Sequence, residues 1–115
     1  MTEQSTLSAE DKKLVTLARA TRARTGAAEG AAVRDLDGRT YAAATVALHS
    51  LQISAVGVCV AMAVSSGSTG LEAVVVLGDG IATEADLAVV REFAGEGVTI
   101  HVGDQRGSIT STLVS

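Results

Sequence analysis

SLQISAVGVCVAMAVSSGSTGLEAVVVL, residues 50–77, determines the expected fold class. Residues 50–65 are apolar on nearly all sides and rich in alanine, which predicts a helix packed against a sheet, although their β-branched residues leave a strand as the alternative. The glycine-bearing loop at residues 65–70 ends that element. Residues 71–77 are a continuous aliphatic run, which is typical of a buried parallel strand. This order indicates an α/β domain.

Helix and strand signals continue on both sides of this stretch. Ser8 fits the N-cap of a first helix, and a turn at residues 35–38 fits a β-hairpin. Gly78-Asp79-Gly80 turns the chain into the last predicted helix. The further predicted elements are helices at residues 8–24 and 83–94 and strands at 30–34, 40–48, 98–102 and 108–113. We expect a single domain, residues 1–115, with residues 1–7 flexible.

The composition limits the classes of partner. Hydrophobic residues make up 47% of the chain, yet it has one Phe, one Tyr and no Trp, so the core must be aliphatic. A small domain with so much aliphatic surface often buries part of it against another copy, and we expect a homo-oligomer, either a dimer or a tetramer. The net charge of -4 argues against nucleic acid and against an anionic membrane surface.

The cysteine content and the hydropathy indicate a location. Cys59 is the single cysteine, which excludes an intramolecular disulfide and a thiolate-rich zinc site and fits a reducing cytoplasm. It lies in an apolar segment, where a free thiol packs as a small hydrophobe. The polar residues 1–10 are not typical of a secretory signal, and residues 53–64 are too few to span a bilayer that needs roughly 20. We therefore expect a cytoplasmic protein.

Short segments between residues 14 and 95 match a known family in order and spacing. They are Gly30-Ala31-Ala32-Val33, Asp37-Gly38-Arg39, residues 41–46, Ala63-Val64-Ser65-Ser66-Gly67, residues 71–76 and Val89-Val90-Arg91-Glu92-Phe93. On these segments the chain resembles the small homotetrameric cytidine deaminases. The resemblance implies a three-layer α-β-α sandwich with a five-stranded mixed sheet.

The resemblance also implies where the catalytic residues would lie. The family's Cys-Ala-Glu motif falls on Ser54-Ala55-Val56, and its Pro-Cys-x-x-Cys motif falls on Ala82-Thr83-Glu84-Ala85-Asp86. In the family, thiolates hold a zinc ion that activates water, and the glutamate carries the proton. Ser54, Thr83 and Asp86 supply no thiol, and Val56 cannot carry a proton. These replacements imply a degenerate member that binds no zinc.

The substrate-binding motifs are replaced as well. The family's Phe-x-Val falls on Ala27-Ala28-Glu29, and the Asn-x-Glu that grips ribose falls on Thr45-Val46-Ala47. Stacking and ribose hydrogen bonding are both lost at these positions. Thr83-Glu84-Ala85-Asp86 is instead typical of a helix capping box, and Ser50 or Ser54 fits a cap of the central helix.

The preferred hypothesis from the sequence is a non-catalytic protein that acts as a structural or regulatory interaction module. One alternative is a module that binds a nucleoside or nucleotide without turnover, through hydrogen bonds from Thr45, Ser54, Thr83 and Asp86.

The other alternative is a residual cytidine deaminase-type hydrolase with an atypical metal site. His49, as an extra residue next to the pocket, would bind the metal together with Asp86. A related possibility joins His49 and His101 with Asp86 or Asp104, although lone histidines in separate segments are more often structural.

Overall fold

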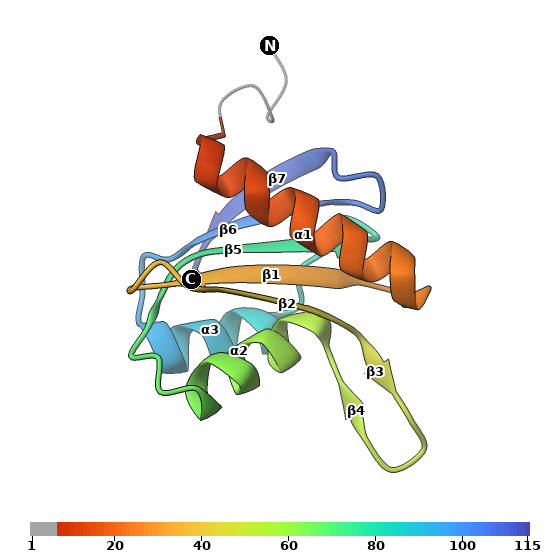
Figure 1. Cartoon of the computed structure of the whole chain (residues 1–115), viewed down its shortest axis with the longest axis horizontal. Coiled ribbons are helices and arrows are strands. Elements are labelled where there is room, and N and C mark those ends of the chain that lie inside the picture. The colour runs from red at the N-terminus through yellow and green to blue at the C-terminus, as the bar shows by residue number, and fades with distance from the viewer. Residues whose placement is uncertain (1–6) are drawn as a thin grey trace.

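The strands of the main sheet are β1 (Gly30–Asp35), β2 (Thr40–Ala44), β5 (Leu71–Gly78), β6 (Thr99–Asp104) and β7 (Ile109–Val114). In the computed structural model, which describes residues 7–115, they form one sheet in the order β2-β1-β5-β6-β7 (Figure 1). β5 and β6 are parallel, whereas the other neighbours are antiparallel. The predicted five-stranded mixed sheet is therefore confirmed.

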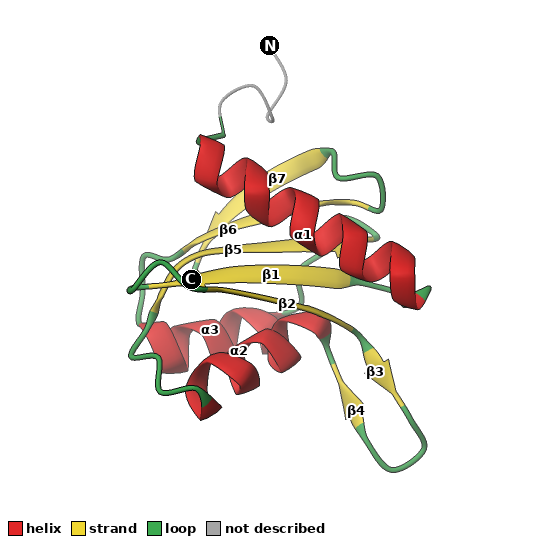
Figure 2. Cartoon of the chain, viewed as in Figure 1, coloured by secondary structure: helices red, strands yellow, loops and turns green. Residues whose placement is uncertain are grey.

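Helices cover both faces of this sheet (Figure 2). The helix α1 (Ala9–Thr25) lies on one face, and α2 (Ala55–Ser65) and α3 (Glu84–Ala94) lie on the other. Side chains of β5 alternate between two cores: Val75 and Leu77 pack under α1, and Val74 and Val76 pack under α2 and α3. Both faces of β5 are buried, which explains its uninterrupted aliphatic sequence. The three-layer α-β-α sandwich is confirmed.

The first helix begins and ends close to the predicted positions. The Ser8 hydroxyl accepts a hydrogen bond from the Asp11 amide at 3.1 Å, and Gly26 ends the helix with a φ of 67°. The flexible segment that we expected at residues 1–7 lies, apart from its last residue, outside the described residues. In the described part of the chain, no helix is both long enough and apolar enough to cross a bilayer.

The prediction for residues 40–65 is wrong in its boundaries. The second strand ends at Ala44, and β3 (Val46–Ala47) and β4 (Gln52–Ile53) form a separate hairpin that projects from the sandwich (Figure 1). The predicted helix does not begin at Ser50, because the Ser54 hydroxyl accepts from the Gly57 amide at 3.0 Å and caps the helix there. Residues 50–53 are too few to show a helical or a strand period, so the sequence alone did not separate the two.

The single cysteine is part of the core, as predicted. Cys59 on α2 has no exposed surface, and burial raises the pKa of its thiol to about 12. Its Sγ lies 3.6 Å from the Tyr41 carbonyl oxygen of β2. A thiol held in this form is not a nucleophile at neutral pH.

Asp35, which the sequence placed only in a turn, is a fully buried carboxylate. Its Oδ1 accepts from the amides of Asp37 and Arg39 at 2.9 Å, and its Oδ2 accepts from Arg39 Nε and from the Ser68 hydroxyl. The pKa of the Asp35 carboxyl group lies below its ordinary value. The hydrogen bond from Ser68 is the largest cause, and the hydrogen bonds from the backbone amides add to it, whereas burial acts in the opposite direction. The carboxylate therefore ties the β1–β2 turn to the loop after α2.

We predict that the stability of Asp35→Asn depends less on pH in the acidic range than the stability of the wild type does. Because the folded-state pKa is lowered, the ionised carboxylate stabilises the fold above its ordinary pKa, and this contribution is lost as the pH falls through the folded-state pKa. The variant should melt below the wild type at neutral pH, and its Tm should fall less between about pH 5 and pH 2. Thermal unfolding followed by circular dichroism measures both effects.

Asp37→Asn is the matched control, because Asp37 lies in the same turn with its side chain 69% exposed. Its Tm profile should follow that of the wild type. Parallel profiles for Asp35→Asn and the wild type would contradict the assigned role of Asp35.

Candidate functional site

The positions that the resemblance assigns to the zinc ligands come together where α2 and α3 begin. Ser54 is the N-cap of α2 and Thr83 is the N-cap of α3. The Ser54 hydroxyl donates to Asp86 Oδ1 at 2.7 Å, and Thr83 Oγ1 accepts from the Asp86 amide at 3.1 Å. We call these three residues the Ser54–Asp86 cluster. The predicted capping roles of Ser54 and Thr83 are confirmed.

One oxygen of the cluster has no partner. Asp86 is only 4% exposed, and its Oδ2 has no hydrogen bond within the described residues. A buried acceptor without a donor costs about 1–3 kcal/mol relative to a satisfied one. Within the cluster, a hydrogen-bond donor added at Asp86 Oδ2 would therefore stabilise the protein most.

Glu29 brings a second acid close to the cluster. It is half-buried in the loop before β1, and desolvation, followed by the negative charges of Asp86 and Asp79, raises the pKa of its carboxyl group. Its backbone is fixed by Thr45, whose hydroxyl accepts from the Glu29 amide at 3.0 Å and whose amide donates to the Glu29 carbonyl oxygen at 3.1 Å. Within residues 7–115, these three acids form no ion pair. The site is therefore acidic.

Gly78 at the end of β5 allows the loop that carries Glu29 to lie close to the strand. A Cβ at Gly78 would lie 3.0 Å from Glu29 Cγ and 3.1 Å from the Ala28 carbonyl oxygen. Gly80 then turns the chain toward α3 with a φ of 82°. The Gly78-Asp79-Gly80 segment thus works as a turn that places Glu29 and the start of α3 together.

The donor set does not fit zinc. Ser54 Oγ and Thr83 Oγ1 are occupied as helix caps, and hydroxyls are poor zinc ligands. Only Asp86 Oδ2 is left among the three positions, whereas a zinc site uses three or four protein ligands. Across residues 7–115, no group of three or more His, Cys, Asp or Glu side chains is arranged to hold a metal ion.

The remaining pocket positions are structural or exposed. Val56 is 1% exposed and belongs to the core under α2 and α3. The Ala27 carbonyl oxygen accepts from Arg22 Nε at 3.1 Å, and Ala47 is exposed on β3. None of these side chains carries a group that can transfer a proton.

The two histidines lie apart. His49 is exposed in the turn of the projecting β3–β4 hairpin (Figure 1), and its place beside the pocket stays a prediction. His101 lies on the α1 face of the sheet, with its Nε2 2.9 Å from Asp11 Oδ2 and its Nδ1 3.0 Å from Thr112 Oγ1. Asp86 lies on the opposite face, so a metal site that joins both histidines with Asp86 is wrong.

Sequence reasoning did not find the direct contact between Ser54 and Asp86. One signal for this contact was present in the sequence. Ser54 and Asp86, at two positions that the resemblance assigns to metal ligands, carry a hydroxyl and a carboxylate, which can form a hydrogen bond with each other. It also missed the proximity of Glu29 to Asp86, since these residues are far apart in the chain.

The family model described as cytidine deaminase-like matches residues 7–107. The chain belongs to the cytidine deaminase-like family. No curated protein shows significant sequence similarity to it.

Solved cytidine deaminases share the fold of this cytidine deaminase-like protein. The enzyme from Mycobacterium tuberculosis is 23% identical, with a TM-score of 0.70 over 81% of this chain and 85% of its own. The enzyme from Burkholderia pseudomallei is 20% identical, with a TM-score of 0.72 over 100% of this chain and 92% of its own. The enzyme from Mycobacterium leprae is 20% identical, with a TM-score of 0.66 over 90% of this chain and 93% of its own. At 20–23% sequence identity, the similarity to these structures shows that the chain has the same fold.

We predict that Ser54→Ala destabilises this cytidine deaminase-like protein by about 1–3 kcal/mol. The substitution removes the cap of α2 and leaves Asp86 Oδ1 buried without its donor. Urea unfolding measures the loss, with the exposed Ser50→Ala as the control. In a double-mutant cycle with Asp86→Ala, the two effects should be non-additive. Additive effects would show that the hydrogen bond contributes nothing.

Proposed function

We propose that this chain is a non-catalytic member of the cytidine deaminase-like family that acts as a structural or regulatory interaction module. The observation that carries the proposal is the hydrogen bond between Ser54 Oγ and Asp86 Oδ1, at 2.7 Å. It joins two positions that the resemblance assigns to zinc ligands. Side chains that satisfy each other across the site stabilise the starts of two helices and are not directed at a metal.

The absence of a proton carrier at the Val56 position supports the same conclusion. Zinc-dependent deamination of a base needs a glutamate that transfers protons between the metal-bound water and the ring. Val56 is buried in the apolar core and offers no titratable group. Restoring such chemistry would require changes at the ligand positions and at this position together.

An apolar surface beside α2 supports the interaction role. Val64 is 53% exposed, and Leu48 and Leu51 on the projecting hairpin are 60% and 48% exposed. A cavity of about 310 Å³ lies between α2 and α3, and Val64, Val89 and Phe93 are among the residues that line it. Exposed apolar side chains mark contact surfaces, and we assign those at both ends of α2 to a homo-oligomer, either a dimer or a tetramer. The buried, unpaired Cys59 suits a reducing cytoplasm for the assembly.

The zinc content of untagged protein, purified without chelator, tests the non-catalytic role. We expect zinc well below stoichiometry by mass spectrometry, and no turnover of cytidine or deoxycytidine above a blank. Both results follow from a donor set in which the two hydroxyls are occupied as caps. Stoichiometric zinc together with turnover would overturn the proposal.

A second candidate function is ligand binding without turnover. The unpartnered Asp86 Oδ2 favours it, because a ligand that donates a hydrogen bond would satisfy this oxygen. Glu29, whose carboxyl pKa is raised beside Asp86, would contribute a second polar group.

We predict that a ligand bound at this site raises the Tm of the wild type and not that of Asp86→Ala. Thermal shifts across a panel of nucleosides and nucleotides measure this, with Glu96→Ala, exposed in the turn after α3, as the control. If no member of the panel shifts the wild type, this candidate is wrong and the interaction role stands without it.

A further inference from the structure

The strand β2 forms an edge of the sheet, and its outer side is unpaired. The Thr45 amide donates to the Glu29 carbonyl oxygen, which fixes the alternation of the β1–β2 ladder. By that alternation, the amides and carbonyls of Thr40, Ala42 and Ala44 point away from β1. Within residues 7–115, no other strand or loop supplies hydrogen-bond partners for these groups.

This edge lacks the features that usually prevent pairing with another chain. Its sequence, TYAAA, contains no proline and no charged residue, and its pairing with β1 has no bulge. Edge strands are normally protected by such features, and an unprotected edge accepts an added strand. The edge of β2 is therefore competent to bind an extended segment.

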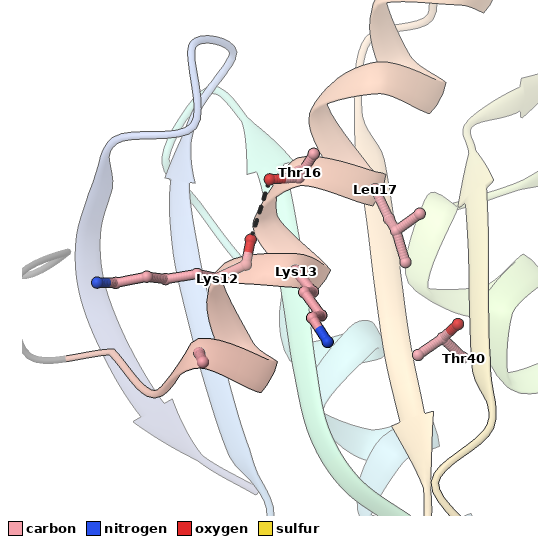
Figure 3. Close-up of a pocket in the computed structure, with 6 residues that line it drawn as sticks. Lys12, Lys13, Thr16, Leu17 and Thr40 are labelled. Atoms are coloured by element: carbon pink, nitrogen blue, oxygen red, sulfur yellow. Dashed lines mark hydrogen bonds between the residues drawn. The ribbon is translucent and has the colours of Figure 1, made fainter.

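A groove lies beside the edge on the α1 face of the sheet. Figure 3 shows Lys13 and Leu17 on α1 above the start of β2, where Thr40 lies. These residues help to line a cavity of about 500 Å³, and Leu17 is 37% exposed in it. A second cavity, of about 480 Å³, shares Lys13 and Thr40 and is also lined by Arg34, Glu10 and Glu72. The two cavities meet at Lys13 and Thr40, and together we call them the groove.

The side chains of the groove follow the strand in order. Asp11 on α1 bonds to Arg34, which is opposite Thr40 in the β1–β2 register. Farther along α1, Ala18 packs against Gly30, which is opposite Ala44. Lys13 therefore lies near the start of β2, and Leu17 lies farther along it.

The groove contains charges of both signs, and across residues 7–115 its lysines are not used in ion pairs. Lys12 and Lys13 are exposed and form no ion pair within the described residues. Arg34 bonds to Asp11 through Nη2 and to Glu72 through Nε, both at 2.9 Å, but its buried Nη1 has no partner in the described residues. Carboxylate oxygens of a partner would form charge-assisted hydrogen bonds with these donors.

We propose that the edge of β2 and this groove bind an extended acidic segment of a partner protein, which joins the sheet as a sixth strand. The residue of the segment opposite Thr40 is an acid that contacts Lys13, and the residue opposite Ala42 is apolar and covers Leu17. Main-chain hydrogen bonds to Thr40, Ala42 and Ala44 supply affinity, and the two side chains supply specificity. This surface is separate from the Ser54–Asp86 cluster, so the inference holds or fails independently of zinc binding.

Amide hydrogen exchange measured by NMR tests the proposal with a defined probe. The probe is the capped peptide Thr-Val-Thr-Glu-Thr-Val-Thr-Glu-Thr, which places glutamate and valine alternately on one face of a strand. At saturating peptide, exchange at Thr40, Ala42 and Ala44 should slow roughly tenfold or more. Tyr41 and Ala43 should not change, because their amides already pair with β1. A peptide with lysine in place of glutamate should have no effect.

Charge reversal provides the second test. Lys13→Glu should abolish the effect of the glutamate peptide and confer an effect on the lysine peptide. Arg24→Glu, an exposed site near the far end of α1, should behave as the wild type. Failure of the glutamate peptide to slow exchange, or equal protection by both peptides, would overturn the proposal. Protection that rises with protein concentration in the absence of peptide would assign the edge to a second copy of the chain and also overturn it.

Discussion

The parallel pairing of β5 with β6 determines where the polar groups of the candidate site lie. A parallel connection requires a crossover, and the crossover here is α3, which begins beyond the carboxyl end of β5. The start of α2 lies beside it, joined through the hydrogen bond from Ser54 to Asp86. Two helix N-termini and the end of a buried strand therefore meet at one place, which is the usual position of a site in an α/β fold.

The side chains at this place decide which chemistry the fold carries. Helix N-termini present free amides, and both hydroxyls of the Ser54–Asp86 cluster are used to satisfy them. A thiolate at the same position would keep its charge available for a metal, whereas the Ser54 hydroxyl accepts from the Gly57 amide and donates to Asp86. A fold and the chemistry of its site are separable, and the side chains at these positions are the basis of the proposed non-catalytic role.

Several features could be predicted because they depend on local sequence. The aliphatic run at residues 71–77 indicated a strand buried on both faces, and Ser8 and Thr83 indicated caps that the structure contains. The β3–β4 hairpin could not be predicted, since residues 46–53 lack a pattern that separates strand from helix. The burial of Asp35 depends on Ser68, which is distant in the chain, and no local signal reveals such a contact. The open edge of β2 likewise follows only from the strand order of the whole sheet.

We propose that Ser54, Thr83 and Asp86, at the positions that the resemblance assigns to the metal ligands, prevent zinc binding through their side chains. The most direct measurement compares the zinc content of the wild type with that of the triple variant Ser54→Cys/Thr83→Cys/Asp86→Cys, both refolded with zinc and then desalted. We expect stoichiometric zinc in the variant and none in the wild type, because three thiolates at these helix starts would complete a site. A folded variant without zinc, or a wild type with as much zinc as the variant, would contradict it.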